Sequence, residues 1–397
     1  MKPLIKVSAS DVSGLTRALE SALAGGPAVW PVPGDASVAD AVATEVDDRI
    51  ALVVETSGST DAPKRVLLSA DALTASADAT HDALGGQGRW LLALPGHYIA
   101  GAQVLVRSIL AGTSPVVIAS AIGAGFDVRE FAEASATLDP RTPAYTSLVP
   151  VQLARLVDAA ERDAFVAAAL TSYDAILVGG QALAAPIAGR AAHLGARVVR
   201  TYGSSETSGG CVYDGVPLAG VEVRADRETD EVLLSGPTLA DGYLGDPDRT
   251  ARAFVAGSGG RRWYRTGDLG GLGADGRLRI RGRADDVIIS GGVKVALGEI
   301  ERAVRALDGF HDAVAVAVDD PEWGQRAVIV VAEASGAFKT PGALETSGAP
   351  EVTLARATDA AGLPPAGRPV RLVVLDALPM LASGKPDRAA IARLAAE

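Results

Sequence analysis

The chain has 397 residues and a formal net charge of −11, and 48% of its residues are hydrophobic. This length predicts two domains, one of them large, and the acidic balance without a long basic run argues against nucleic acid or an anionic membrane surface as the main partner. The single cysteine, Cys211, excludes an internal disulfide and a thiolate metal cluster, so a reducing cytoplasm is the expected compartment.

The N-terminal segment, residues 1–7, lacks the continuous apolar core of a signal peptide, so we expect no secretion. The most apolar region, residues 90–125, is interrupted by two prolines, a histidine and an arginine, which is typical of a protein core and not of a membrane span. We therefore expect no membrane insertion and small-molecule partners, with a homodimer left open.

An apolar strand at residues 51–54 leads into the segment Thr56-Ser-Gly-Ser-Thr-Asp-Ala-Pro-Lys64. Its hydroxyls and successive backbone N–H groups can wrap an anion, and Lys64 adds a positive charge, so the segment is suited to phosphate. It is not a Walker A loop, because its lysine follows a proline and precedes no Ser or Thr. An ordinary solvated turn is the alternative for this segment alone.

Strand-like runs alternate with helical patterns over residues 50–212. The predicted strands are 51–54, 90–94, 115–119, 144–148, 175–178 and 197–201, and the predicted helices are 69–84, 99–110, 128–136, 151–160 and 185–193. This alternation predicts a largely parallel sheet covered by helices, with ligands at the carboxyl ends of its strands.

After Gly210 the pattern changes to short strands at 221–224, 231–235 and 277–281, which predict a small antiparallel or barrel-like portion. A second domain is predicted from about residue 285, with helices at 298–307 and 389–394 and strands at 313–318 and 327–332. Residues 335–366 have the composition of a loose connector.

Five separated segments, in this order, resemble motifs of the adenylate-forming superfamily of acyl-CoA synthetases, luciferases and peptide-synthetase adenylation domains. They are the phosphate-loop segment Thr56 to Lys64, Tyr202-Gly-Ser-Ser-Glu-Thr207, Tyr264-Arg-Thr-Gly-Asp268, Arg281-Gly-Arg-Ala-Asp-Asp286 and Ser383-Gly-Lys-Pro-Asp387. The resemblance covers roughly residues 50 to 390.

The resemblance implies an α/β fold: a large N-terminal domain, residues 1–284, with mostly parallel sheets, helices and a small β portion, and a small mobile α+β domain, residues 285–397. It also implies an AMP-forming acid–thiol ligase that uses ATP, Mg²⁺ and CoA. Because one anion must attack another, such an enzyme needs groups that cancel negative charge.

By resemblance, the catalytic residues are Lys385, Glu206, Ser205 and His97, and Glu206 also holds the metal. The residues implied to bind ATP or AMP are Thr56, Ser57, Gly58, Ser59, Thr60, Lys64, Gly179, Gly180, Gln181, Tyr202, Gly203, Asp268 and Arg283. Asp285 matches the hinge position, and Gly291 and Gly292 match the place where the pantetheine arm of CoA passes. The non-catalytic alternatives are a carboxylate at a helix N-terminus for Glu206, a solvated turn for Asp268 and a surface lysine for Lys385.

Two positions depart from the family pattern. Ser205 stands where threonine is usual and keeps the hydroxyl, and Asp61 replaces the usual second glycine of the phosphate loop. A carboxylate near a triphosphate is unfavourable, so Asp61 is expected to point outward or to cap a turn.

About 55 residues precede the phosphate loop, fewer than in most members of the superfamily, and this short form is similar to the actinobacterial o-succinylbenzoate–CoA ligases of menaquinone biosynthesis. His97 falls where the family has a residue gating the acyl pocket, with a satisfied core histidine as the alternative. Arg107 is the candidate for the second carboxylate of this acid, because a charge in an apolar helix needs a partner, and a protein carboxylate is its equal competitor.

The expected reaction joins o-succinylbenzoate to CoA through an acyl adenylate. Another aryl or acyl acid, or a carrier-loading adenylation reaction, is the alternative within the superfamily. A nucleotide-binding regulator without turnover is the alternative from another class, and the presence of Glu206, Asp268 and Lys385 argues against it.

Overall fold

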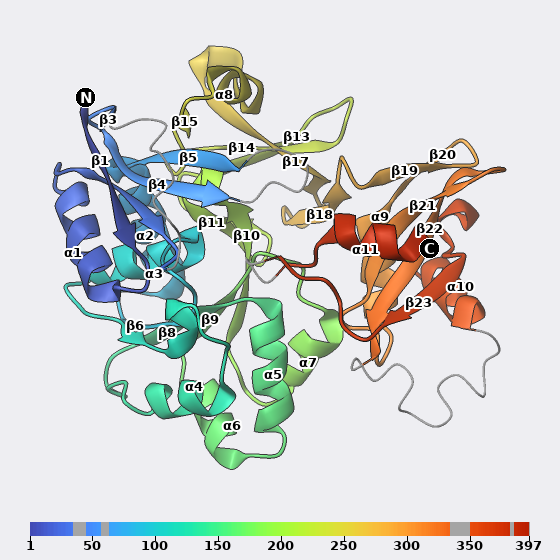
Figure 1. Cartoon of the computed structure of the whole chain (residues 1–397), viewed down its shortest axis with the longest axis horizontal. Coiled ribbons are helices and arrows are strands. Elements are labelled where there is room, and N and C mark those ends of the chain that lie inside the picture. Colours follow the sequence, from blue (N-terminus) through green and yellow to red (C-terminus); the bar gives the residue numbers. More distant parts are fainter. Residues whose placement is uncertain (35–44, 57–62, 334–349, 382–384, 397) are drawn as a thin grey trace.

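The computed structural model describes residues 1–34, 45–56, 63–333, 350–381 and 385–396. Four β-sheets form its framework, with helices packed against them (Figure 1). Three sheets come from residues up to 283 and the fourth from residues after 286, so the large α/β part and the smaller C-terminal part confirm the predicted fold class. The exact boundary at residues 284 and 285 stays a prediction.

The first sheet is built largely from the N-terminal residues, in the order β15-β5-β4-β2-β1-β3. Its strands are β1 (Lys2–Ser8), β2 (Ala28–Val32), β3 (Glu45–Val46), β4 (Ile50–Thr56), β5 (Lys64–Ser69) and β15 (Gly242–Tyr243). β1, β2 and β4 run parallel, so their carboxyl ends share one edge of the sheet, and α1 (Val12–Leu23) connects β1 to β2. This sheet was not foreseen as a separate layer.

The second sheet is the mostly parallel one that the alternation predicted, in the order β12-β11-β10-β9-β8-β6-β7. Its strands are β6 (Arg89–Leu92), β7 (Val116–Val117), β8 (Ala144–Leu148), β9 (Ala175–Val178), β10 (Val198–Ser204), β11 (Gly209–Tyr213) and β12 (Val216–Pro217). β11 and β12 are antiparallel additions at one edge.

Helices cover both faces of the second sheet, because alternate residues of its strands point to opposite sides. Trp90 and Leu92 of β6 belong to the core shared with the first sheet, whereas Leu91 belongs to the core under α4 to α7. The helices are α2 (Ala70–Leu84), α3 (Ile99–Leu110), α4 (Val128–Ser135), α5 (Pro150–Ala160), α6 (Ala164–Thr171) and α7 (Ala185–His193).

The third sheet is antiparallel throughout, as the glycine-rich turns predicted. It contains β13 (Glu222–Ala225), β14 (Glu231–Ser235), β16 (Phe254–Ala256), β17 (Arg262–Leu272) and β18 (Leu278–Arg283), and α8 (Pro247–Ala253) precedes β16. Short 3₁₀ turns lie at η1 (Ala119–Ile122), η2 (Ser205–Thr207) and η3 (Ser258–Gly260).

The fourth sheet forms the C-terminal part. It contains β19 (Val287–Ser290), β20 (Val293–Ala296), β21 (Val314–Asp320), β22 (Gly324–Ala332) and β23 (Arg371–Leu375), with α9 (Leu297–Arg305), α10 (Pro350–Ala360), η5 (Pro365–Gly367) and α11 (Arg388–Ala396). α9 and α10 pack on one face, and α11 packs on the other. α10 lies inside the range predicted as a connector, so that prediction is wrong for residues 350–360.

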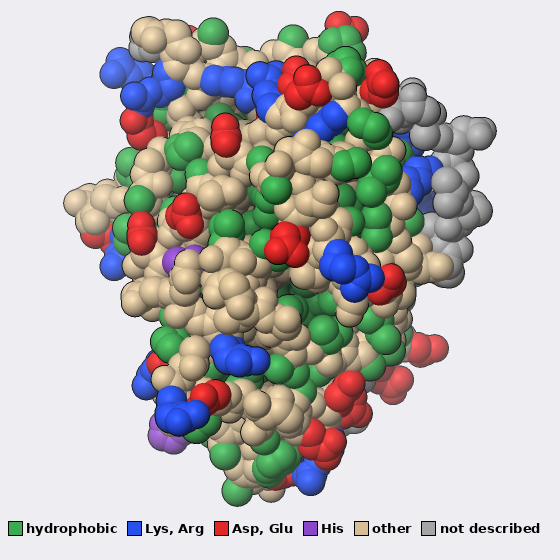
Figure 2. Space-filling model, turned by 90° about the vertical axis from the view of Figure 1, so that its left-hand side faces the viewer, with side chains coloured by type: hydrophobic (Ala, Val, Ile, Leu, Met, Phe, Trp, Pro, Cys, Tyr) green, Lys and Arg blue, Asp and Glu red, His purple; other side chains and the backbone are tan. Residues whose placement is uncertain are grey.

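Figure 2 shows one face of the molecule, on which acidic and basic side chains are interspersed and the basic ones gather toward the end where α8 lies in Figure 1. No helix among the described residues is long and apolar enough to cross a membrane.

Candidate active site

The ends of the phosphate-loop segment are fixed by the antiparallel pairing of β4 and β5. Thr56, the last residue of β4, lies opposite Lys64, the first residue of β5. The Lys64 ammonium lies 6.0 Å from the centroid of the Tyr243 ring. The described residues do not include Ser57, Gly58, Ser59, Thr60 or Asp61, the last of which is the position that departs from the family pattern.

Glu206 sits in the η2 turn between β10 and β11, and its side chain is buried. Its Oε1 accepts a hydrogen bond of 2.9 Å from the Tyr243 hydroxyl, and its backbone carbonyl accepts one of 2.8 Å from Ala240 N. Ser205 beside it is also buried. The turn therefore holds the predicted metal carboxylate in a fixed place.

The backbone after Glu206 turns sharply at Ser208, which has a φ of 54° in the left-handed region. Two buried donors from different helices stabilise this conformation, because Ser76 Oγ of α2 and Gln103 Nε2 of α3 both donate to the Ser208 carbonyl, at 2.9 and 2.8 Å. Side chains of α2 and α3 therefore stabilise this strained turn.

Asp268 lies on β17 and meets two other predicted site residues. The Tyr202 hydroxyl donates to its Oδ2 at 2.6 Å, and Arg283 Nη1 lies 3.3 Å from its Oδ1. Burial raises the pKa of the Asp268 carboxyl, although the bond from Tyr202 and the charge of Arg283 oppose that rise. Arg283 also pairs with the predicted hinge residue Asp285, at 3.1 Å.

The two glycines after β9 lie where chain segments approach closely. A Cβ on Gly179 would lie 2.3 Å from Thr201 Oγ1, and Gly180 has a φ of +81°. Gly203 is under similar constraint, because a Cβ there would lie 2.1 Å from the Gly209 carbonyl oxygen. A side chain at Gly179 or Gly203 would clash, whereas at Gly180 the positive φ is what disfavours one. Gln181 follows directly in the same loop.

Lys385 comes from the C-terminal part and enters this site. Its Cε would lie 4.0 Å from a Cβ on Gly180, and Figure 1 shows the segment before α11 running from the fourth sheet toward the rest of the molecule. Burial, followed by the charge of Arg283, lowers the pKa of the Lys385 ammonium, whereas Asp268 and Glu206 act to raise it. The residue as a whole nevertheless remains exposed, and its catalytic role stays a prediction.

The loop that carries Lys385 is anchored by its backbone. Leu381 N donates to the Lys385 carbonyl at 2.8 Å, and Asp387 N donates to the Pro379 carbonyl at 2.9 Å. The backbone of the lysine is therefore fixed to the C-terminal part.

The structure does not bring Arg107 to His97. The His97 ring lies 4.1 Å from that of Tyr98 and lines a pocket of about 400 Å³, together with N-terminal residues such as Ser8 and Ser10. Arg107 lies in the last turn of α3, about 12 Å along the helix axis from its first residue. There it is buried, 5.0 Å from the centroid of the Trp90 ring, and forms no ion pair within the described ranges.

Gly291 and Gly292 form the turn between β19 and β20, with φ values of +56° and +81°. A Cβ on Gly291 would lie 2.6 Å from the Trp323 ring. No contact between these glycines and Lys385 is found among the described residues, so their predicted role toward CoA is not displayed in this arrangement.

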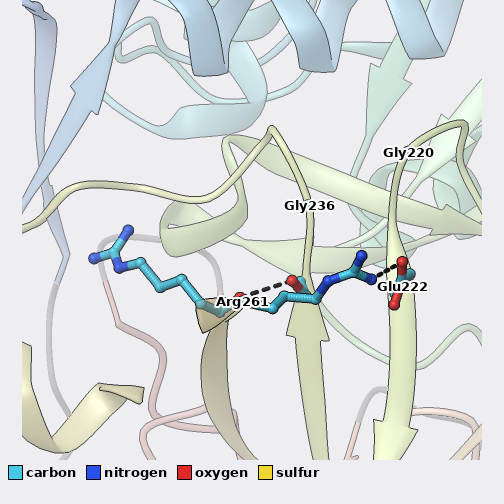
Figure 3. Close-up of a pocket in the computed structure, with 6 residues that line it drawn as sticks. Gly220, Glu222, Gly236 and Arg261 are labelled. Atoms are coloured by element: carbon cyan, nitrogen blue, oxygen red, sulfur yellow. Dashed lines mark hydrogen bonds and ion pairs between the residues drawn. The ribbon is translucent and has the colours of Figure 1, made fainter. Parts of the chain in front are cut away.

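A separate pocket of about 320 Å³ lies beside β13, β14 and β17 (Figure 3). It is lined by Gly220, Glu222, Ser235, Gly236, Arg261 and Arg262, none of which was predicted as a site residue. Arg261 pairs with Glu222, and the Arg262 guanidinium donates to two backbone carbonyls, those of Ala240 and Asp241. The guanidinium groups of Arg261 and Arg262 in this pocket therefore already have partners within the protein.

Tyr243 is a site residue that sequence reasoning missed. It is 37 residues from Glu206 in the chain, and the surrounding Gly242-Tyr-Leu-Gly245 shows the features of a turn and no catalytic spacing. The sequence signal for this residue was the pair of glycines, Gly242 and Gly245, that flank the short segment Tyr243-Leu244.

The donor set suits magnesium as a partner of bound phosphate. Within the described ranges, no cluster of three or more His, Cys, Asp or Glu side chains could hold a metal alone. Mg²⁺ is commonly bound through one or two carboxylates plus substrate phosphates, and Glu206 provides one buried carboxylate at the site.

The sequence has clear relatives. A family model described as AMP-binding enzyme matches residues 8–244. The "Probable 2-succinylbenzoate–CoA ligase" of Mycobacterium tuberculosis strain H37Rv is 42% identical over 401 residues, 99% of this chain and 98% of the relative. The 2-succinylbenzoate–CoA ligase of Geobacillus sp. strain WCH70 is 29% identical over 70% of this chain and 58% of the relative.

Solved structures share the fold. The o-succinylbenzoate CoA synthetase of Bacillus subtilis, in complex with the acyl-adenylate intermediate OSB-AMP, has a TM-score of 0.72 at 23% identity, over 95% of this chain and 80% of that one. The family match and the full-length relative confirm the resemblance first inferred from five short segments, and the chain belongs to the AMP-binding enzyme family.

Proposed function

We propose that the chain is an ATP-dependent acid–thiol ligase that converts o-succinylbenzoate, ATP and CoA to o-succinylbenzoyl-CoA, AMP and pyrophosphate. The full-length relative at 42% identity supports this choice of acid. The observation that supports the chemistry most directly is the position of Lys385 beside Gly180, within the electrostatic reach of Asp268 and Glu206.

In the first half-reaction, a carboxylate oxygen of the acid attacks the α-phosphorus of ATP, and the bond to pyrophosphate breaks. The Lys385 ammonium would lie between the two reacting anions and reduce their repulsion. Asp268 would accept hydrogen bonds from the ribose hydroxyls, and Thr56 and Lys64 would border the phosphates. Mg²⁺, held by Glu206, would supply positive charge against the phosphate oxygens.

In the second half-reaction, the CoA thiol attacks the acyl carbonyl carbon and releases AMP. The proposed pivot is Asp285, about which residues 285–397 would turn to withdraw Lys385 and present Gly291 and Gly292 to the pantetheine arm. The proposed setting is the cytoplasm, and a homodimer is compatible with this reaction.

The identity of the acid is tested by ATP–pyrophosphate exchange with a panel of acids. We expect strong exchange with o-succinylbenzoate and weak exchange with benzoate and with other aryl acids. Strong exchange with another acid and no exchange with o-succinylbenzoate would show that the enzyme activates a different acid.

The role of Lys385 is tested by separating the two half-reactions. Lys385→Ala should lower the rate of adenylate formation by about 10² to 10³ or more, while sparing CoA transfer from supplied acyl adenylate. Arg356→Ala, which removes an exposed cation from α10, serves as the charge-matched control. Equal loss of both half-reactions in Lys385→Ala would contradict the assigned role.

A further inference from the structure

Tyr243 connects two elements of the candidate site that come from different sheets. It lies on β15, which pairs with β5 so that Tyr243 is opposite Val66, two residues after Lys64. Its hydroxyl donates to Glu206 Oε1 at 2.9 Å, and its ring faces the Lys64 ammonium at 6.0 Å. One buried side chain thus touches the predicted metal carboxylate and faces the lysine at the end of the phosphate loop.

The Tyr243 ring is held in place by its neighbours. Its backbone N donates to Thr250 Oγ1 at 2.9 Å, and a Cβ on the preceding Gly242 would lie 2.5 Å from Thr250 Cγ2. On the other side, the Phe254 ring lies 5.9 Å away and is followed by the Tyr264 ring at 5.2 Å. A ring packed in this way presents its hydroxyl in one direction.

The hydrogen bond from Tyr243 gives the two carboxylate oxygens of Glu206 different surroundings. Oε1 accepts from Tyr243, whereas Oε2 accepts no hydrogen bond from the part of the chain that the structure describes. Glu206 also belongs to none of the ion pairs found there. A phenol donor is neutral, so it orients the carboxylate without cancelling the charge that attracts a cation.

We propose that Tyr243 is a positioning residue that fixes the Glu206 carboxylate so that Oε2 faces the Mg²⁺ bound with ATP. The inference rests on the proposed ATP-dependent function and adds a residue to it. Hydrogen-bond partners of metal ligands commonly change metal affinity by about 10- to 100-fold when they are removed.

The test uses Tyr243→Phe in the full chain, which keeps the ring packing against Phe254 and removes the donor. Binding of Mn²⁺ in the presence of ATP is measured by electron paramagnetic resonance, without any acid substrate. We expect Mn²⁺ affinity to fall about 10-fold or more, while ATP affinity in excess EDTA is unchanged. In exchange assays the apparent KM for Mg²⁺ should rise, and kcat at saturating Mg²⁺ should be mostly recovered.

Tyr173→Phe is the matched control, because it removes another buried tyrosine hydroxyl, one that lies 2.7 Å from Ser135 Oγ in the core under α4 to α7. It should leave Mn²⁺ affinity unchanged. Equal Mn²⁺ affinities for wild type, Tyr243→Phe and Tyr173→Phe would overturn the proposal, as would an equal loss in both variants.

A double-mutant cycle tests the same contact by a second measurement. If Tyr243 acts through the carboxylate, Tyr243→Phe should have no further effect on Mn²⁺ affinity in a Glu206→Gln background. Additive effects would refute the proposal. Failure of the wild type to bind Mn²⁺ with ATP would instead refute the ATP-dependent function itself, so the two failures are distinguishable.

Discussion

Arg107 is a buried cation whose place in the fold differs from the one expected of an acid-binding residue. Its guanidinium packs on the Trp90 ring, at the end of α3 far from His97. We therefore assign it a packing role and propose no acid contact for it. Arginine stems and guanidinium planes both contribute packing of this kind.

Substitution of Arg107 distinguishes packing from acid binding. Arg107→Ala should lower the free energy of unfolding by about 2 kcal/mol, because it leaves a cavity against Trp90. Arg107→Met should cost less, since it fills the space and removes a buried charge that forms no ion pair with the described residues. Neither variant should change the ratio of KM values for o-succinylbenzoate and a matched monocarboxylate. A selective rise for the dicarboxylate would restore the assignment made from sequence.

The motif residues could be identified from sequence, but their protein partners could not. Glu206, Asp268 and Lys385 stand in short segments that resemble motifs of the adenylate-forming superfamily. The hydroxyls of Tyr202 and Tyr243 reach Asp268 and Glu206 across 66 and 37 residues, and no local spacing encodes such contacts. Only the packing of strands from separate sheets brings them together.

At the scale of helices and strands, periodicity predicted some ranges to the residue and missed the ends of others. α3 (Ile99–Leu110) and α7 (Ala185–His193) match their predicted ranges, whereas the strand predicted at 90–94 ends at Leu92, three residues before Pro95. α10 was missed because it is weakly amphipathic, with Leu354 and Thr358 as its buried residues. Alanine-rich composition concealed its helical pattern.

A charge network joins α9, α11 and β21 in the C-terminal part. Arg388 Nη2 lies 2.6 Å from Glu301 Oε2, its Nη1 donates to the Ala315 carbonyl at 2.9 Å, and Arg305 approaches Glu301 at 2.9 Å. The Glu301 side chain is 9% exposed, so loss of one partner leaves a buried charge less well compensated.

Arg388→Met should lower the free energy of unfolding by about 2 kcal/mol, a value reduced by the remaining Arg305 contact. The matched control is Arg368→Met, which removes an exposed pair with Asp359 and should cost less than Arg388→Met. Urea unfolding monitored by circular dichroism measures both. Equal costs for the two variants would show that burial of Glu301 does not matter.

At the scale of the whole molecule, the proposed rotation about Asp285 predicts a free-energy cost for placing the Lys385 ammonium in the site before ATP is bound. Burial and Arg283 hold the pKa of its ammonium below the ordinary value of 10.5. If the rotation exposes the lysine fully, the arrangement described here binds fewer protons than the rotated one. Its stability rises with pH between the lowered pKa and 10.5, and a bound phosphate anion would reverse this effect.

Lys385→Met should favour the compact arrangement in the absence of nucleotide, because it removes the cost of burying a charge. Small-angle X-ray scattering at neutral pH should give a smaller radius of gyration for this variant than for the wild type or for the exposed-site control Arg356→Met. ATP should compact the wild type more than the variant. A larger radius for Lys385→Met would indicate that the ammonium holds the parts together even without ATP.

The anchoring of the Lys385 loop limits how fast the lysine could enter and leave the site in the proposed rotation. β23 precedes the loop and pairs with β22, and α11 follows it and packs on the same sheet through Ile391 and Ala395. A side chain can change rotamer within picoseconds to nanoseconds, but displacement of a tethered sheet takes roughly microseconds to milliseconds. Under the proposed mechanism, the interval between adenylate formation and thiol attack would therefore depend on the movement of the whole C-terminal part and not on the rotation of one side chain.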